Sequence, residues 1–501
     1  MIARKSALII ATQIANGILG YIGLKFIALY MQPWEYGIVG FAYGYVALFS
    51  IFRQLGFDEA HVKRISEGKD LGKCIATFSL VKLFLAGLMA SIVILSIAIW
   101  KYLMHRGFET PLHEKAVYIM LAWFVLGTLT QSMRMTFNAK KEIAKSQLPQ
   151  FLFTFVRVIA TIYVALMNLG ALALAYTYLF GGIFNFSLAL YFFKDYPIDK
   201  PSLSYFKEYA KFAMPMAIAS ASYIIMMNVD KVFIQLFYAA EQVGHYFAIF
   251  NLSRFIILFA TSVGLLLFPT ISEYHAKNNF REIRKLTLQA ERYLSMIVFP
   301  IVTLMIVLAK PIIHILLSDK YMPALPVLQI LPIFVLIEAI ARPYVAKLQG
   351  MDMPNLIRNR VIIMAILNVI LNLILIPKDI RMLGLKLAGL GIRGAAIATV
   401  VAYMIGMIYI RYKAWKITKI RGNIKIAFHA IAAILTGFIL NYMAVYISRW
   451  YELLAIALFG IAIYFAFLFL MREFKKEDFE FFVDTLNIKK MIKYIKEEVK
   501  K

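Results

Sequence analysis

The sequence predicts an all-α integral membrane protein of about fourteen transmembrane helices. Of its 501 residues, 62% are hydrophobic and only 16% are charged, and the mean hydropathy is +0.74. Soluble proteins carry about 25% charged residues. A helix that crosses a bilayer needs about 20 mostly apolar residues, and such runs recur along nearly the whole chain. No polar block is long enough for a separate soluble domain.

The spans follow one another from the N-terminus. The first apolar run is too long for the core of a signal peptide and lacks a small-residue cleavage site, so we expect it to be retained as the first span. Polar side chains interrupt the fifth span at Arg157 and the seventh at Asn228, Asp230 and Lys231. The predicted spans are residues 6–30, 36–56, 75–100, 116–137, 148–168, 170–193, 210–238, 244–268, 292–317, 326–346, 358–376, 392–412, 425–447 and 452–471.

The distribution of basic residues predicts the topology. With the N-terminus in the cytoplasm, about 39 of the 54 Lys and Arg fall in inner segments and about 10 in outer ones, as the positive-inside rule expects. The outer turns near 32–35, 168–171 and 239–243 contain neither residue, and the outer loop 378–393, with four, is the main exception. The net charge of +26 therefore serves membrane topology rather than nucleic-acid binding, and both termini are expected in the cytoplasm.

A faint internal repeat relates the two halves of the chain. Glu35-Tyr36-Gly37 follows the first span, and Glu241-Gln242-Val243-Gly244 follows the seventh. Lys25 lies twelve residues before Gly37, and Lys231 lies thirteen before Gly244. A second match pairs residues 59–63, with the sequence Glu-Ala-His-Val-Lys, with residues 273–277, Glu-Tyr-His-Ala-Lys.

Such a repeat predicts two pseudo-symmetric six-helix lobes in parallel orientation around a central cavity. The first lobe is residues 1–193 with spans 1–6, and the second is residues 194–412 with spans 7–12. Residues 413–471 add two C-terminal spans. Residues 472–501 form a basic cytoplasmic tail, either solvated or as an amphipathic helix on the anionic leaflet.

The motifs of common enzyme classes are missing from the sequence. It contains no Walker phosphate loop, no Rossmann glycine fingerprint and no H-E-x-x-H zinc motif. Its one cysteine, Cys74, excludes an internal disulfide and a thiolate metal cluster. The short outer loops disfavour an embedded glycosyltransferase. We therefore expect a transporter without enzymatic activity, cofactor or metal.

Charged residues within spans are the best candidates for a site, because each costs several kcal/mol unless it faces a cavity or a partner. Lys25, Arg157 and Arg254 are cations without an obvious acidic partner, and a cavity lined this way attracts an anion. Our hypothesis is that they bind the pyrophosphate of a lipid-linked sugar, since arginine binds phosphate with a bidentate fork. The alternative is that they snorkel or bond to backbone carbonyls. Lys82 lies nearer the inner surface and is expected to snorkel.

Two further pairs are suggested by spacing. Asp230 and Arg254 each lie twelve residues from Gln242, so a helical hairpin places them at one depth. Together with Lys231 they form either a gate or coupling site, or a fixed ion pair between the seventh and eighth spans. Glu338 and Arg342 are spaced i,i+4 and are expected to form a local structural pair.

Three stretches carry a resemblance to a known family. One runs from Tyr209-Ala-Lys-Phe-Ala-Met-Pro215 through Asp230-Lys231 to Val243-Gly-His-Tyr246. The second is Leu267-Phe-Pro-Thr-Ile-Ser272. The third runs from 316–331 to Asn368 and Asn372, which are expected to hydrogen-bond between helices, and ends at Gly394-Ala-Ala-Ile-Ala-Thr399. In order and spacing, these stretches resemble the polysaccharide-transporter (Wzx-type oligosaccharide flippase) family of the MATE-like MOP flippase superfamily.

The resemblance implies a bundle that alternates between inward-open and outward-open states. Its cargo would be a polyprenyl-diphosphate-linked oligosaccharide, turned from the cytoplasmic to the outer leaflet, with membrane lipids and a glycan polymerase or glycosyltransferase as candidate partners. Only Asp230 and Lys231 are carried over by motif. The alternatives are a cation-coupled multidrug antiporter, which the excess of cations disfavours, a flippase for a peptidoglycan lipid precursor, and a non-transporting scaffold of a glycan-assembly complex.

Overall fold

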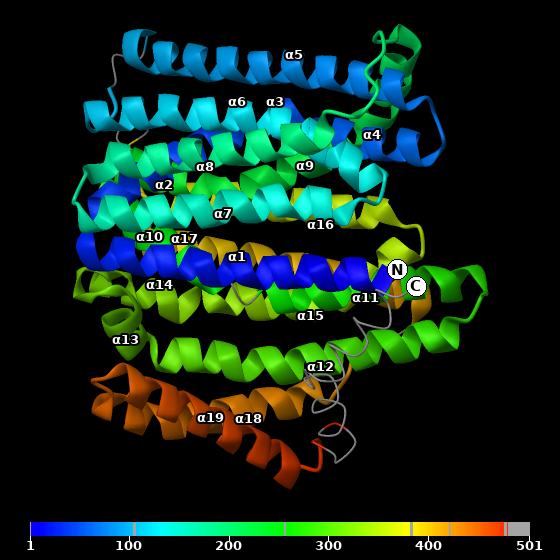
Figure 1. The fold of residues 1–501 in the computed structure, drawn as a ribbon. Helices are drawn as coiled ribbons and strands as arrows, with labels where there is room; N and C mark the ends of the chain where they lie inside the picture. The colour runs from blue at the N-terminus through cyan, green and yellow to red at the C-terminus, as the bar shows by residue number, and fades with distance from the viewer. Residues whose placement is uncertain are drawn as a thin grey trace. The chain divides into compact units, whose positions relative to one another are not determined.

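The protein is a bundle of long helices (Figure 1). The computed structural model describes residues 2–103, 107–254, 257–380, 384–419, 422–474 and 478. The helices of the first half are α1 Ile2–Tyr30, α2 Pro33–Phe49, α3 Ile51–Gln54, α4 Phe57–Ser66, α5 Leu71–Ala98, α6 Pro111–Ala139, α7 Ile143–Leu166, α8 Gly170–Phe193, α9 Leu203–Phe237 and α10 Ala240–Arg254. The elements of the second half are α11 Ile257–Ala276, α12 Phe280–Val307, α13 Ala309–Ile312, α14 Leu325–Ile330, α15 Pro332–Gly350, α16 Pro354–Leu375, β1 Asp379–Ile380, β2 Leu385–Lys386, α17 Ile392–Thr418, α18 Ile426–Met443 and α19 Trp450–Leu470.

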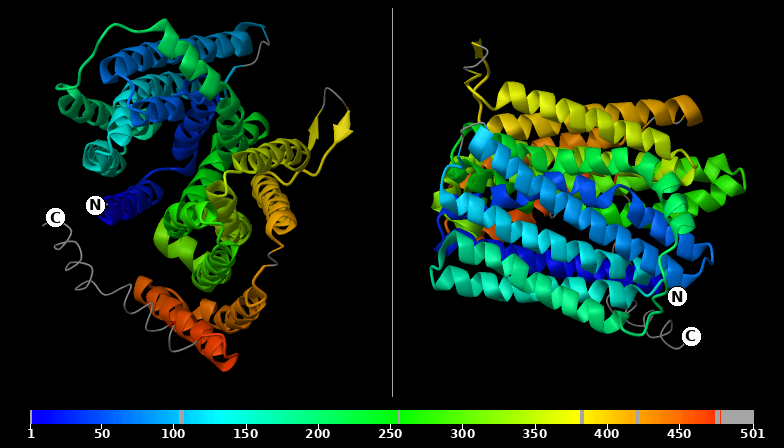
Figure 2. Two further views of the ribbon diagram at one scale, coloured as in Figure 1. Left: turned by 90° about the vertical axis from the view of Figure 1, so that its right-hand side faces the viewer. Right: turned by 90° about the horizontal axis from the view of Figure 1, so that it is seen from above.

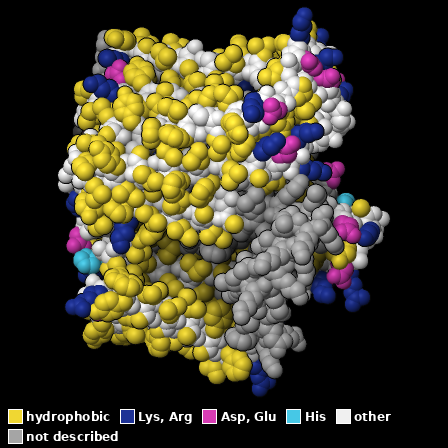
Figure 3. All heavy atoms as spheres, in the orientation of Figure 1, with side chains coloured by type: hydrophobic (Ala, Val, Ile, Leu, Met, Phe, Trp, Pro, Cys, Tyr) yellow, Lys and Arg dark blue, Asp and Glu magenta, His cyan; other side chains and the backbone are white. Residues whose placement is uncertain are grey.

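The all-α membrane fold predicted from the sequence is confirmed. Within the described residues, twelve helices are long and apolar enough to cross a membrane, and α2 with the bent α3–α4 segment would make a thirteenth. The eighth predicted span, 244–268, falls on α10 and α11, which are separated by residues 255–256, outside the described part of the chain. Figure 3 shows the expected surface, with hydrophobic side chains over α5 to α8 and charged ones mostly toward the helix ends.

The second predicted span, 36–56, covers most of α2 and all of α3, with a bend between them. Helix α2 ends at Phe49, and the chain continues through α3 and α4 after a bend of 45°. Leu55 and Gly56 both have left-handed backbone conformations, with φ of 41° and 76°, so they separate α3 from α4. The bend keeps Arg53 of α3 among the helices, where its guanidinium reaches the backbone of α6.

The helices gather into two compact units, each considered by itself. One comprises residues 12–250 with 358–402, and the other residues 1–11, 251–357 and 403–501. In the first unit, α6 packs against α2, α5 and α8, α7 packs against α8, and α2 and α4 pack against α9. Its inner core includes Phe57, Phe78, Leu85 and Tyr209. The predicted lobes, 1–193 and 194–412, concern the symmetry of the chain and stay a prediction.

In the second unit, α12 packs against α11, α15 and α18, and α18 packs against α19. The two spans predicted for residues 413–471 are thus α18 and α19, fixed on α12 by a cluster that includes Met296, Ala432, Tyr464 and Leu468. The loop predicted at 378–393 contains a two-residue antiparallel ribbon, β1–β2, which projects beyond the end of α16 (Figure 2). Most of the basic tail lies outside the described residues.

Candidate functional site

A polar cleft opens in the first unit between α2, α3, α6, α7 and α8. We call it the cationic cleft, and its volume is about 200 Å³. It is lined by Tyr43, Arg53, Trp123, Phe124, Gly127, Thr130, Gln131, Arg134, Gln150, Phe153 and Asn185. None of these lining residues is acidic, whereas two are arginines.

The two arginines of the cleft are held at its polar side. The Nη1 atom of Arg53 donates to Thr128 Oγ1 at 3.2 Å, and its guanidinium lies 5.2 Å from the ring centre of Phe124. The Nη1 atom of Arg134 lies 3.5 Å from Gln150 Oε1. Both side chains are half-buried. These contacts hold each guanidinium group in place, while part of it remains accessible to a ligand in the cleft.

Arg157 adjoins the aromatic wall of this cleft. Its guanidinium lies 4.8 Å from the ring centre of Tyr178 and 5.8 Å from that of Phe153. Trp123 stacks on Phe153 at 5.7 Å and meets Tyr178 edge to face at 5.2 Å. One aromatic cluster therefore joins Arg157 to the cationic cleft, through contacts on α6, α7 and α8.

The Nε atoms of Arg53, Arg134 and Arg157 are buried, and none has a hydrogen-bond partner among the described residues. The same holds for the Nε atoms of Arg64 and Arg342, so this feature is not confined to the cleft. Arg53 and Arg134 differ from the others because they line the cleft, where guanidinium groups could meet the oxygens of a phosphate group.

Asp58 lies near both cleft arginines but balances only part of the positive charge there. Asp58 pairs with Lys82 and also accepts a hydrogen bond from Gln131 at 3.1 Å. Lys82 also donates to the backbone oxygen of Arg53 at 3.0 Å. Because Asp58 is engaged by Lys82, the two cleft arginines keep an excess of positive charge. Lys82 is 1% exposed, so our expectation that it snorkels is wrong. Its ammonium group is instead buried within the protein and paired with Asp58.

Asp230 occupies a fully hydrogen-bonded position in the same unit. Its carboxylate accepts hydrogen bonds from Tyr246 of α10 at 2.6 Å, Asn372 of α16 at 2.5 Å and Thr399 of α17 at 2.9 Å. Asn372 also donates to Asn368 within α16 at 3.0 Å, and the Asn368 amide lies 3.4 Å from Thr399 Oγ1 of α17. The bonds from Asn372 to Asp230 and from Asn368 to Thr399 confirm the expected interhelical role of these amides. Arg254 belongs to the other compact unit, so its pairing with Asp230 stays a prediction.

Lys231, the neighbour of Asp230, is buried against aromatic rings. Its Nζ atom donates to the backbone oxygen of Met227 at 2.7 Å and lies 4.9 Å from the ring centre of Phe250. The same ammonium group lies 5.9 Å from the ring of Tyr43, whose side chain also lines the cationic cleft. Lys231 therefore adds positive charge behind that wall.

The other predicted residues are dispersed. Lys25 is half-buried on α1 and makes no hydrogen bond or ion pair with the described residues. Arg254 is exposed at the end of α10. In the second unit, Arg342 Nε lies 2.9 Å from Glu338 Oε1, so this i,i+4 pair forms; its structural role stays a prediction.

Sequence reasoning missed Arg53 and Arg134. Both lie near the inner ends of predicted spans, 36–56 and 116–137, and were therefore not considered as charges within the membrane. A usable signal exists for Arg134: Gln131 and Thr130 precede it, and a polar run of this kind on a continuing helix indicates a polar cavity. The sequence around Arg53 gives no such signal. Arg53 lies among the helices only because the chain bends after α2.

Comparisons with known proteins concern the family and the fold of the chain. The profile of a family described as polysaccharide biosynthesis protein matches residues 27–326. The chain is 23% identical over 410 residues to the probable low-salt glycan biosynthesis flippase Agl15 of Haloferax volcanii, covering 81% of this chain and 82% of the relative.

Two solved structures share the fold. The lipid II flippase MurJ in an inward closed conformation superposes with a TM-score of 0.75 at 18% identity, covering 93% of this chain and 99% of that one. An inward-facing multidrug resistance MATE family transporter of the MOP superfamily superposes with a TM-score of 0.62 at 16% identity, covering 81% and 96%. Because the profile spans more than half of the residues, the chain belongs to the polysaccharide biosynthesis protein family, within the fold shared by MOP-superfamily flippases and transporters.

Proposed function

We propose that the protein is a flippase that carries a polyprenyl-diphosphate-linked oligosaccharide from the cytoplasmic to the outer leaflet by alternating access. The observation that carries this proposal is the cationic cleft, which is lined by Arg53 and Arg134 and has no acidic residue among its lining residues. A diphosphate would accept hydrogen bonds from the accessible parts of these side chains, and the adjoining aromatic rings offer flat apolar faces to a sugar.

The size of the cationic cleft supports binding of a headgroup rather than of a whole glycan. Its volume of about 200 Å³ is below the range of roughly 300–1,000 Å³ typical of sites that enclose drug-sized ligands. We infer that the cleft holds the diphosphate and that the glycan extends beyond it. Binding of the diphosphate in the cleft would attach the charged part of the cargo to α2, α3, α6, α7 and α8.

The charge of the cleft argues against a multidrug antiporter. Binding a cationic drug or a coupling proton requires an available carboxylate, whereas Asp58, the acidic group beside the cleft, is engaged by Lys82. A non-transporting scaffold has no need of a cleft lined by two arginines.

The relatives support a glycan-linked cargo. One is named a glycan biosynthesis flippase and the other a lipid II flippase. We further propose that the protein lies in the cell membrane with both termini in the cytoplasm, as the basic residues predict, and that a glycan polymerase or glycosyltransferase works with it.

Reconstituted vesicles test this function directly. Flipping of a polyprenyl-diphosphate oligosaccharide would be measured for the wild type and for Arg53→Gln, Arg134→Gln and Arg157→Gln. We expect each substitution to slow flipping by roughly tenfold, because each removes one charged hydrogen-bond donor to the phosphate. Arg157→Lys, which keeps the charge but loses the fork, should fall between the wild type and Arg157→Gln. The matched control is Arg281→Gln, on an arginine exposed near the start of α12.

Two outcomes would overturn the proposal. One is equal flipping by the wild type and all three glutamine variants. The other is a wild type that moves none of several such lipids but exports cationic dyes under an ion gradient, which would establish the antiporter instead.

A further inference from the structure

A second and larger cavity lies in the first unit, where the α5–α6 connection meets the turn between α9 and α10. We call it the Trp100 pocket, and its volume is about 610 Å³. It is lined by Phe41, Tyr45, Trp100, Gly107, Phe108, Glu109, Val232, Gln235, Leu236, Phe237, Tyr238 and Ala239. The basic-residue pattern predicts that these turns face the outside of the cell.

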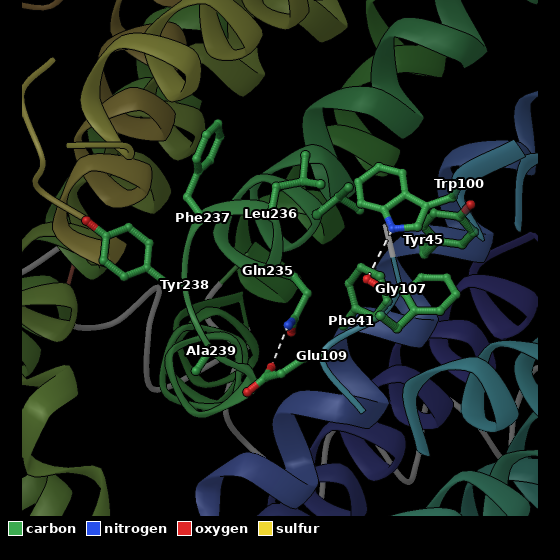
Figure 4. A pocket seen from close by; sticks show the side chains of 12 residues that line it. Phe41, Tyr45, Trp100, Gly107, Glu109, Gln235, Leu236, Phe237, Tyr238 and Ala239 are labelled. Atoms are coloured by element: carbon green, nitrogen blue, oxygen red, sulfur yellow. Dashed lines mark hydrogen bonds between the residues drawn. The ribbon is translucent and has the colours of Figure 1, made fainter. Parts of the chain in front are cut away.

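One side of the pocket is an aromatic wall (Figure 4). Trp100 and Phe108 are stacked, with ring centres 6.5 Å apart and planes 11° from parallel. Phe108 meets Tyr45 edge to face at 6.1 Å, and Phe41 at 5.8 Å. The indole nitrogen of Trp100 donates to Gly107 at 3.4 Å. These contacts hold the aromatic rings in place in the absence of a ligand.

Polar groups meet this wall beside Glu109. The Glu109 carboxylate accepts hydrogen bonds from the Gln235 amide and from the backbone N–H of Ala240, both at 2.8 Å and both through Oε2. Its Oε1 atom is left available. The Gln235 side chain also hydrogen-bonds His113 at the start of α6, which holds it beside Glu109. The Glu109 carboxylate therefore remains as an acceptor where small hydroxyl groups could bind.

The charge of this pocket is opposite to that of the cationic cleft. No Lys or Arg is present among its described lining residues, and Glu109 is acidic. Such a pocket repels a diphosphate. Aromatic faces combined with carboxylate and amide groups instead suit a sugar ring, whose C–H faces pack on aromatic rings while its hydroxyls donate and accept hydrogen bonds. The volume lies within the range of ligand-binding cavities.

We propose that the Trp100 pocket is a glycan-binding site for phosphate-free sugar rings, and that it receives the oligosaccharide part of the cargo at the outer end of the helices. This inference rests on the proposed flippase function for the identity of the glycan. The carboxylate and the amide would bind hydroxyl groups, and Trp100 would provide the stacking platform.

Ligand-observed saturation-transfer NMR on the full chain in lipid nanodiscs tests the site. The probe is the oligosaccharide released by mild acid from the polyprenyl-linked pool of the source cells, which carries no phosphate. We expect transfer to its ring protons in the wild type, and roughly fivefold weaker binding in Trp100→Ala, in line with the contribution of an aromatic contact. Trp100→Phe should retain most of the binding because it keeps a flat ring. Gln235→Leu should weaken binding without removing the aromatic wall.

Trp450→Ala is the matched control, because Trp450 is exposed on α19 and should leave binding unchanged. Inorganic diphosphate should not displace the glycan. The inference is overturned if the wild type shows no transfer, if Trp100→Ala and Gln235→Leu both bind as the wild type does, or if tetraphenylphosphonium binds where the glycan does not. Arginine-dependent flipping without glycan binding would reject this inference alone. Glycan binding without flipping would reject only the proposed function.

Discussion

A close crossing of two helices in the first unit leads to a specific prediction about stability. Near their N-terminal ends, α2 and α10 approach backbone to backbone at Gly37 and Gly244. A Cβ atom added at Gly37 would lie 1.7 Å from the carbonyl oxygen of Ala240, and one added at Gly244 would lie 1.9 Å from that of Pro33. These two glycines also occupy matching places in the internal repeat of the sequence.

The size of the effect follows from these distances. Real Cβ contacts are essentially never shorter than 3.0 Å, so Gly37→Ala requires the two backbones to separate by about 1.3 Å. A side-chain rotation cannot relieve the clash, because the opposing atoms belong to the Ala240 backbone. Overpacking costs about 1–3 kcal/mol and occasionally more, and a backbone clash belongs at the upper end. We expect a fall in apparent Tm of roughly 5 °C or more.

The assay is the loss of monodisperse protein after heating, followed by fluorescence-detected size exclusion. The matched control is Gly87→Ala in the middle of α5, where an added Cβ meets nothing within 4 Å. That substitution should leave the protein unchanged or stabilise it by up to about 1 kcal/mol, since alanine is the better helix former. Equal apparent Tm values for Gly37→Ala and Gly87→Ala would refute the crossing described here.

Two further predictions concern charged groups. Lys82→Met should destabilise the protein by about 3–5 kcal/mol, because it leaves Asp58 buried without its ion-pair partner. Adding Asp58→Asn to this variant should recover part of the lost stability in the same heating assay. If the double variant recovers none of it, the ion pair does not contribute to stability. Burial raises the pKa of Glu142, but hydrogen bonds from Lys145 and Tyr196 outweigh it and lower the pKa overall. The stabilisation from Glu142 should therefore be complete above the ordinary glutamate pKa of about 4.3 and lost as the pH falls through the lowered value. The Tm difference between wild type and Glu142→Gln should be present at pH 7 and shrink at pH 3, and a constant difference would contradict this assignment.

The transmembrane spans were predictable because a long run of hydrophobic residues directly indicates a helix that lies in the lipid bilayer. Helices α5 and α19 fall within a few residues of their predicted ranges, 75–100 and 452–471. The bend after α2 was not predictable, since it depends on the left-handed conformation of Leu55, a residue type that rarely adopts it. Apolar composition alone does not distinguish a straight span from one that bends within the bundle.

The site was predictable only in part, for a related reason. Arg157 was found because it interrupts an apolar run, and mid-span charge is costly wherever the helix packs. The partners of Asp230 were not predictable from local spacing: Asn372 and Thr399 are 142 and 169 residues away along the chain. Spacing around the nearest turn favoured Arg254 instead, because a single sequence reports local geometry and not which distant helices meet.

Depth in the membrane is therefore a poor guide to which charges bind a ligand. Asp230 and Lys82 are each almost fully buried, yet the chain itself provides their partners, so their burial cost is already offset by the fold. Arg53 and Arg134, in contrast, are only half-buried and line a cleft that has no acidic residue among its lining residues. The proposed binding of a diphosphate therefore rests on these two accessible charges and not on the most deeply buried ones.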